Sequence, residues 1–321
     1  MNTPNKDTQY LQSLIDKGGD IAITAKPDGS VYEINTPLVV KSGCHITLDG
    51  CTLRLADGVY SNIFISEGAW NDATKEPVPL VTDVKITGRN GAKLDGGTPN
   101  DLREKTANRN GLPHMLNNTF LLFRNVDGFE VSDLILSDPR YWCLTFYYCR
   151  DGVISDIEFK ASDNVPNQDG IDLRRGCHDI EIARLHGSTG DDTVALTGLR
   201  HSMETECFDV PGEPDDIHSV TISDVSTEVT GGHGIIRLLN HDGVRLHDIV
   251  VKDIYDKHID NGGKPNQAAV RIGDANYWSI APASDGDTYN ITVENVTTSS
   301  PVPVKVHGVI GNLKIEQICQ R

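Results

Sequence analysis

A short strand pattern recurs along most of the chain and limits what it can fold into. Apolar residues alternate in seven segments: 128–136, 152–159, 179–187, 219–227, 243–251, 290–298 and 312–318. We aligned these segments on Leu134, Ile157, Leu185, Val225, Ile249, Val296 and Ile318. The steps are then 23, 28, 40, 24, 47 and 22 residues, which we interpret as single turns, with an insertion at 40 and two turns at 47. Strands at this period predict an all-β, single-stranded, right-handed parallel β-helix.

A second strand recurs once per turn. It occupies 119–123, 143–148, 170–175, 193–198, 234–239, 268–273 and 302–307. Its alternation points Ile171, Leu173, Val194, Leu196, Val270 and Ile272 inward, and Asp172, Ala195 and Arg271 outward. In 234–239 the pattern leaves two alternatives open, because either Arg237 lies inward or the strand has slipped by one residue.

The remaining segments suggest one domain over 1–321. A helix is expected at 7–17, where it would cap one end of the solenoid, and no other helix is expected. Longer connections at 97–117, 199–216 and 256–267 interrupt the repeat. The first two are expected to form walls beside a site.

Composition excludes several classes of protein. The chain has 46 acidic against 29 basic residues and a net charge of -17, which argues against binding nucleic acid. No apolar run approaches the roughly 18 residues of a membrane span. Seven cysteines without paired spacing predict reduced, mostly buried thiols rather than a zinc site. The polar first residues show no signal peptide, so the chain as written is expected to be cytoplasmic, or secreted or periplasmic if trimmed. We expect a monomer or weak oligomer.

Polar groups precede the second strand in four turns. They are Tyr141-Trp142, Asn167-Gln168-Asp169, Gly190-Asp191-Asp192 and Gly232-His233-Gly234. Because neighbouring parallel strands lie about 4.7–4.9 Å apart, these groups should stack at one corner. Asp169 is then expected beside Asp191 and Asp192, with His233 one coil beyond.

Three neighbouring carboxylates raise the pKa of at least one of them, which provides a proton donor near neutral pH. Hydrolysis of a glycosidic bond needs one such acid and one carboxylate that activates water or attacks. Asp and Asn before Gly are also favoured in turns, which is the competing interpretation. Two adjacent acids gain nothing as a turn, and this favours the functional interpretation of Asp191 and Asp192.

With these residues in view, the chain resembles glycoside hydrolase family 28, the polygalacturonases. The resemblance rests on "NQDGIDL" (167–173), "GDDTVAL" (190–196) and "GGHGI" (231–235), with support from 86–97 and 137–146. It implies an inverting hydrolase without metal or cofactor, acting on an oligo- or polysaccharide. By motif position, Asp191 would be the general acid, Asp169 and Asp192 would activate water, and His233 would be the nearby histidine. The family resemblance also implies closely clustered acids.

One motif departs from the family pattern. The family's Arg-Ile-Lys is "VRIGD" (270–274) here, so Arg271 remains while Gly273 replaces the lysine and Asp274 follows. A missing ammonium and an added acid both weaken binding of a sugar carboxylate. A different uronic linkage or a neutral sugar is therefore as much expected as polygalacturonan. The candidate substrate-binding residues are Arg271, Asn167, Trp142, Tyr141, Arg237 and Arg174.

Two other functions remain open on the same fold. A polysaccharide lyase or epimerase would use a Lys, Arg or Tyr base near the sugar C5, and the aspartates would then hold calcium. A tailspike-like glycan-binding module would perform no chemistry. Calcium dependence and an ultraviolet-absorbing product would indicate the lyase.

Overall fold

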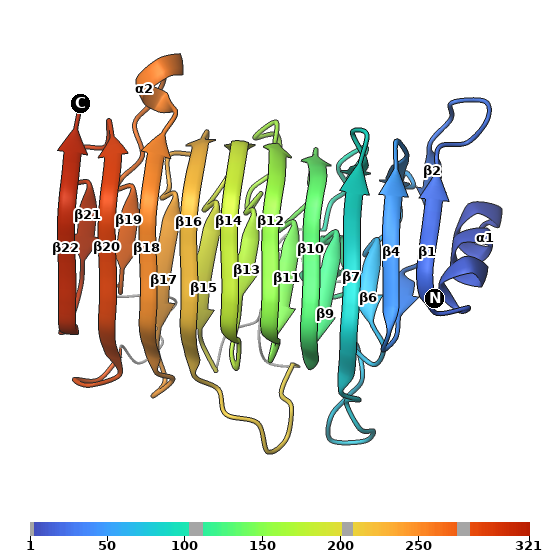
Figure 1. Cartoon of the computed structure of the whole chain (residues 1–321), viewed down its shortest axis with the longest axis horizontal. Helices are drawn as coiled ribbons and strands as arrows, with labels where there is room; N and C mark the ends of the chain where they lie inside the picture. The colour runs from blue at the N-terminus through green and yellow to red at the C-terminus, as the bar shows by residue number, and fades with distance from the viewer. Residues whose placement is uncertain (1–2, 103–111, 201–207, 275–282) are drawn as a thin grey trace.

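The computed structural model describes residues 3–102, 112–200, 208–274 and 283–321, which wind into a right-handed parallel β-helix (Figure 1). One sheet contains thirteen of the described strands and the other contains nine, and every pair within them is parallel. The first sheet follows the order β1 (Gly19–Thr24), β4 (Cys44–Asp49), β7 (Val81–Arg89), β10 (Val126–Ser137), β12 (Arg150–Lys160), β14 (His178–Thr189), β16 (Ile217–Val229), β18 (Leu246–Asp256), β20 (Thr288–Thr298) and β22 (Gly311–Gln320). It also includes β2 (Tyr32–Ile34), β5 (Thr52–Leu55) and β8 (Lys93–Asp95).

The second sheet supplies one short strand per coil. Its strands are β3 (Leu38–Val40), β6 (Phe64–Ser66), β9 (Leu121–Arg124), β11 (Leu144–Tyr147), β13 (Ile171–Leu173), β15 (Val194–Gly198), β17 (Ile236–Asn240), β19 (Val270–Ile272) and β21 (Val304–Val306). Each coil from β10 to β21 therefore consists of one long strand followed by one short strand, as the two repeated patterns predict.

The long strands bend twice, at residues with positive φ that lie five positions apart. The pairs are Gly128 and Asp133, Asp151 and Asp156, Asp179 and Arg184, Ser219 and Asp224, Asp248 and Asp253, Asn290 and Asn295, and Asn312 and Gln317. Asn and Asp tolerate this left-handed conformation better than other residues with a Cβ. Hydrogen bonds between coils support the bends, as in Asn295 Nδ2 to Asp253 Oδ1 at 2.6 Å.

Replacing Asp253 with valine is expected to lower the free energy of unfolding by about 1–2 kcal/mol, because a β-branched residue fits the left-handed conformation poorly. The change also removes the acceptor of the Asn295 hydrogen bond. Urea denaturation measures the loss. Lys252→Val is the matched control, since Lys252 is exposed in the same strand without positive φ. Equal effects of the two variants would contradict this role for the bend.

The paired register corrects one part of the repeat. Val225 lies opposite Ile254, not Ile249, and Ile254 lies opposite Val296. The last steps are thus 29, 42 and 22 residues, and the long step is one coil with insertions rather than two turns. The error arose because both bends carry the same signature, an acid or amide followed by an apolar residue. The 40-residue step from Leu185 to Val225 is one coil with an insertion, as predicted.

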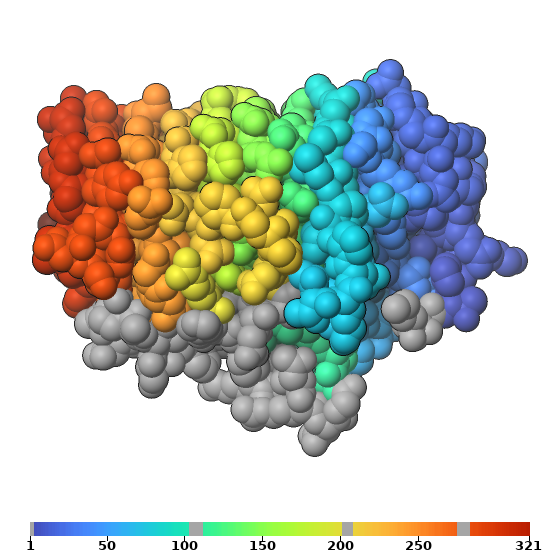
Figure 2. Space-filling view, turned by 90° about the horizontal axis from the view of Figure 1, so that it is seen from below, coloured from blue at the N-terminus to red at the C-terminus, as the bar shows by residue number. Residues whose placement is uncertain are grey.

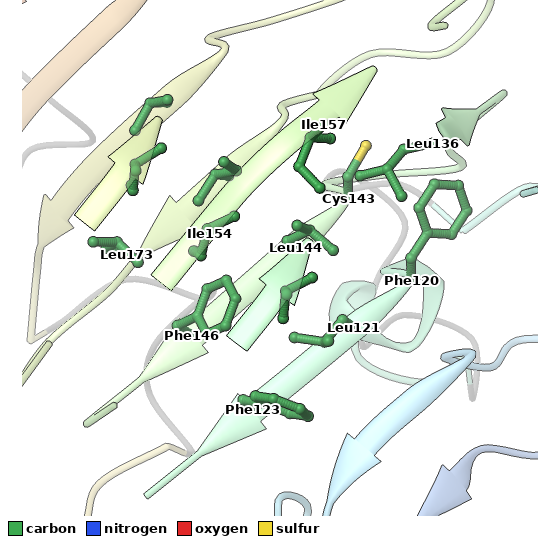
Figure 3. Close-up of a cluster of buried hydrophobic side chains, with 14 of the residues drawn as sticks. Phe120, Leu121, Phe123, Leu136, Cys143, Leu144, Phe146, Ile154, Ile157 and Leu173 are labelled. Atoms are coloured by element: carbon green, nitrogen blue, oxygen red, sulfur yellow. The ribbon is translucent and has the colours of Figure 1, made fainter. Parts of the chain in front are cut away.

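The core lies between the two sheets and consists of stacked apolar side chains (Figure 3). The rings of Phe129 and Phe146 stack with centroids 5.0 Å apart, and Phe123 meets Phe146 edge-on at 5.9 Å. Cys143, Cys149 and Cys177 are buried among them as free thiols, as expected. Cys44 and Cys51 are also buried and free, whereas Cys319 is exposed and Cys207 lies outside the described residues.

The short strands alternate as the sequence predicts. Ile171, Leu173, Val194, Leu196, Val270 and Ile272 all belong to the core. The open question at 234–239 is resolved by a bulge, because the N–H groups of Ile235 and Ile236 both donate to the carbonyl of Ala269. Ile236 and Leu238 then point inward, so Arg237 points outward.

Helix α1 (Lys6–Ile15) covers the N-terminal end of the solenoid (Figure 1). The Asn5 side chain caps it by accepting from the Thr8 N–H, and Leu11 and Ile15 enter the core. Two short helices were not predicted: α2 (His258–Asn261) and the 3-10 helix η1 (Met115–Asn118). Both lie inside long connections, where their few residues give no readable helical period. No described helix has the length and apolar character needed to cross a membrane.

A satellite apolar cluster covers the outside of β9 and β11. Phe208 packs there against Trp70 at 5.2 Å and against Tyr147 at 4.6 Å between ring centroids. Figure 2 shows the segment before β16 (gold) beside the segment before β7 (cyan). Leu102 and Leu116, from the 97–117 connection, belong to the same cluster. Residues 103–111 and 201–207 of the two predicted walls lie outside the described residues. The covered outer face ends near Trp142, where a polar cavity begins.

Candidate active site

A polar cavity of about 290 Å³ lies on the outer face of β13, β15, β17 and β19. Its floor is a row of outward-pointing residues set by strand register: Asp172, Ala195, Arg237 and Arg271. Its other lining residues are Trp142, Asn167, Asp169, Arg174, Asp191, Asp192, Thr197, His233, Gln267 and Asp274. The cavity therefore collects residues from five successive coils.

The three predicted aspartates meet at the corner that precedes the short strands. One oxygen each from Asp169, Asp191 and Asp192 lies within 4.8 Å of the other two. Backbone hydrogen bonds fix this approach, because the Gly170 N–H donates to the Asp192 carbonyl at 3.0 Å. Glycine is required beside them, since a Cβ on Gly190 would lie 2.9 Å from the Gln168 side chain. The stacked corner is thus as the sequence predicts.

The surroundings of Asp191 raise the pKa of its carboxyl group. Its burial, followed by the adjacent Asp192 carboxylate, raises the pKa of Asp191 from 3.8 to about 6, while His233 and Arg237 oppose the rise. The His233 Nδ1 atom lies 3.3 Å from Asp191 Oδ1, so the imidazole also reaches the cluster. A carboxyl group that keeps its proton at mildly acidic pH can donate it to a leaving oxygen.

Asp192 is held in a different way. Its Oδ1 atom accepts the Gly234 N–H at 2.9 Å, and its Oδ2 atom lies 4.0 Å from Arg237 Nε. The side chain is 6% exposed. The cluster therefore places Asp191, whose pKa is raised, beside a second carboxyl group in a partly buried setting.

The same cluster offers a set of oxygen ligands. Carboxylates within 4.8 Å of one another could hold a cation, as the lyase alternative requires. Acid clusters also occur without an ion, so this geometry fits both functions. Sensitivity to a chelator separates them.

Five of the predicted binding residues line the cavity: Asn167, Trp142, Arg174, Arg237 and Arg271. Trp142 is only 3% exposed, and the Arg174 guanidinium lies over its ring at 4.7 Å. Tyr141 corrects the prediction, because it is 1% exposed and does not line the cavity. Its ring packs in the satellite cluster, and its hydroxyl contacts the Met115 sulfur at 3.1 Å.

Several lining residues were not chosen from the sequence. Asp172 was expected to point outward, and this orientation was the available signal for its place in the cavity. Thr197 lies two residues beyond Ala195 on the same face of β15. Gln267 precedes β19, and its N–H donates to the carbonyl of His233 at 3.0 Å. Its position follows from the insertion before β19, whose path the sequence does not reveal.

The family model for glycosyl hydrolases family 28 matches residues 20–262. A polygalacturonase of Persea americana is 24% identical over 220 residues, covering 59% of this chain and 47% of the relative. An exopolygalacturonase of Zea mays is 22% identical over 311 residues, covering 90% of this chain and 71% of the relative. A second Zea mays exopolygalacturonase is covered over 41% of its length, so the chain spans less than half of two of these relatives.

Solved structures share the fold. The exopolygalacturonase from Thermotoga maritima aligns with a TM-score of 0.58 at 14% identity, covering 97% of this chain and 76% of that one. The polygalacturonase from Erwinia carotovora ssp. carotovora aligns with a TM-score of 0.58 at 15% identity, covering 98% and 91%. These likenesses extend over nearly the whole solenoid.

Proposed function

The chain belongs to glycosyl hydrolase family 28, and we propose that it hydrolyses a glycosidic bond in a pectic or related glycan by direct, inverting displacement. The observation that carries this proposal is the aspartate cluster in the cavity, in which Asp191 has a pKa of about 6. The named relatives are polygalacturonases, which supports a pectic substrate.

Each acid is assigned one role. Asp191 donates its proton to the leaving glycosidic oxygen, and Asp169 and Asp192 accept a proton from the attacking water. His233 lies beside Asp191 and helps to set its charge or to hold the sugar. The arginines and Trp142 bind the glycan around this centre.

The stereochemical outcome needs its own test. The nearest carboxylate oxygens lie within 4.8 Å, whereas inverting enzymes usually separate their carboxyl groups by about 6.5–9.5 Å. Inversion is therefore proposed from family membership rather than from this spacing. Proton NMR of the first product resolves it, because an inverting enzyme releases the anomer opposite to that of the substrate bond. Retention would contradict direct displacement.

The proposed activity predicts that wild type releases reducing ends from one or more glycans in a pectic and neutral panel. Asp191→Asn should lower the rate of this release by at least about 100-fold, and a chelator should leave it unchanged. Chelator-sensitive cleavage with an unsaturated product would support a lyase instead. Binding of a glycan without any product would support a tailspike-like module. Either of these results would overturn the hydrolase proposal.

We further infer that the chain acts as a monomer or weak oligomer and binds no nucleic acid. Its net charge of -17 supports the second point, since a polyanion is repelled. Light scattering coupled to size exclusion measures the oligomeric state.

A further inference from the structure

The cations of the cavity already have acidic partners. Arg237 Nη2 lies 3.2 Å from Asp274 Oδ2, and Arg271 Nη2 lies 3.6 Å from the same oxygen. The three side chains are 11%, 12% and 27% exposed, so solvent screens their charges weakly. Asp274 thus neutralises much of the positive potential that this arginine pair would otherwise present to a ligand.

The third arginine of the cavity, Arg174, also has an acidic partner. The Arg174 side chain is 2% exposed, and its Nη1 atom lies 3.9 Å from Asp172 Oδ1. Among the lining residues, three arginines face five aspartates. Counted by formal charge, these arginines and aspartates are therefore negative overall, with or without the charge of Asp191.

The backbone after β19 holds Asp274 in this place. Gly273 has a φ of +73°, and a Cβ on it would lie 2.2 Å from the carbonyl oxygen of His307. A larger residue therefore cannot stand at 273 without moving the neighbouring coil. The turn at Gly273 places Asp274 directly beside Arg237 and Arg271, so the position of the Asp274 carboxylate depends on this glycine.

We propose that Asp274 makes the subsite beside Arg237 and Arg271 selective for an uncharged sugar unit, an inference that rests on the hydrolase function proposed above. A galacturonate carboxylate at this subsite would compete with Asp274 for the same guanidinium groups and would meet its negative charge. An uncharged unit avoids this repulsion while its hydroxyl or carbonyl oxygens accept hydrogen bonds from the arginine N–H groups. The unit is a neutral sugar or a methyl-esterified uronic acid, which share this chemistry.

The test compares kcat/KM of wild type on three substrates: de-esterified galacturonan, highly methyl-esterified galacturonan and a neutral galactan. We expect the de-esterified polymer to be the poorest. Preference for the esterified polymer identifies the ester as the source of the uncharged unit, and preference for galactan identifies a neutral sugar. A wild type that prefers the de-esterified polymer overturns the inference.

Asp274→Asn is expected to raise the ratio of kcat/KM for the de-esterified over the uncharged substrate by about tenfold or more, mainly through KM. Asp285→Asn is the matched control, because it removes the same charge at an exposed residue that does not line the cavity. An unchanged ratio in Asp274→Asn overturns the inference. If that variant does not fold, the order of the three substrates in wild type still decides, because a preference for the de-esterified polymer overturns the inference.

The outcomes separate this inference from the proposed function. If cleavage depends on Asp191 but is faster on the charged polymer, the role proposed for Asp274 is wrong and the hydrolase function stands. If no substrate of the panel is cleaved in a way that depends on Asp191, both the hydrolase function and the role of Asp274 are wrong.

Discussion

Replacing Asp191 with asparagine is expected to lower kcat by about 10²–10⁴-fold, the usual contribution of a positioned general acid. Asparagine keeps the size of the side chain but cannot donate a proton of suitable pKa to the leaving oxygen. Initial rates on the best substrate of the panel measure the effect, with KM expected to change much less than kcat. Turnover near the wild-type value would show that another group protonates the leaving oxygen.

The pH profile gives a second readout of the same role. Since the pKa of Asp191 is raised to about 6, wild-type kcat should fall about tenfold per pH unit above that value, as the acid loses its proton. The residual activity of Asp191→Asn should lack this alkaline limb. An identical limb in the variant would assign the titration to a different group.

The same substitution should stabilise the protein at neutral pH. A folded-state pKa above 3.8 means that the fold disfavours the charged carboxylate, so stability is lost as pH rises from about 4 to about 6. The loss is at most about 3 kcal/mol for this rise. Urea denaturation should therefore find Asp191→Asn more stable than wild type at pH 8 and similar at pH 4. Asp285→Asn, which changes an exposed carboxylate, should show no such difference.

Replacing Phe146 with alanine is expected to lower the free energy of unfolding by about 3–5 kcal/mol, the typical cost of emptying a buried aromatic site. Phe146 is fully buried beside Phe123 within the solenoid (Figure 3). Its ring stacks on Phe129 and meets Phe123 edge-on. The rigid stack of coils leaves little freedom to close the space. The cost should exceed that of any single surface change considered above.

Urea denaturation followed by circular dichroism measures this loss. Val153→Ala is the control, because Val153 belongs to the adjacent β12 but is 39% exposed. Its effect should stay within about 0.5 kcal/mol. A loss below about 1 kcal/mol for Phe146→Ala would mean that neighbouring rings close the cavity, against the packing described here.

The short strands and the acid corner were predictable because their information is local. The alternation of apolar and polar residues was enough to predict that Asp172 and Arg271 point outward. The stacking of strands was enough to predict that Asp169 lies beside Asp191. Contacts made by insertions were not predictable in this way. Tyr141 entered the satellite cluster because the 97–117 and 199–216 connections supply apolar partners there. Likewise, the pairing of Asp274 with Arg237 depends on the path of one turn rather than on any motif.

The two bends of each long strand leave the chain with a competing way to fold. If β18 slid by five residues along β16, Val225 would meet Ile249, Ile222 would meet Leu246, and Val220 would meet Val244. These three pairs would still be apolar, and Asp248 would take the place of Asp253 at the second bend. The shortness of the connection between β17 and β18 excludes this slipped register. Ile217 would then pair with His241 immediately after β17 ends at Asn240, which leaves no residues for the turn. The length of the connection 241–245 therefore selects the native register of β18 on β16. The buried side chains alone do not distinguish the two registers.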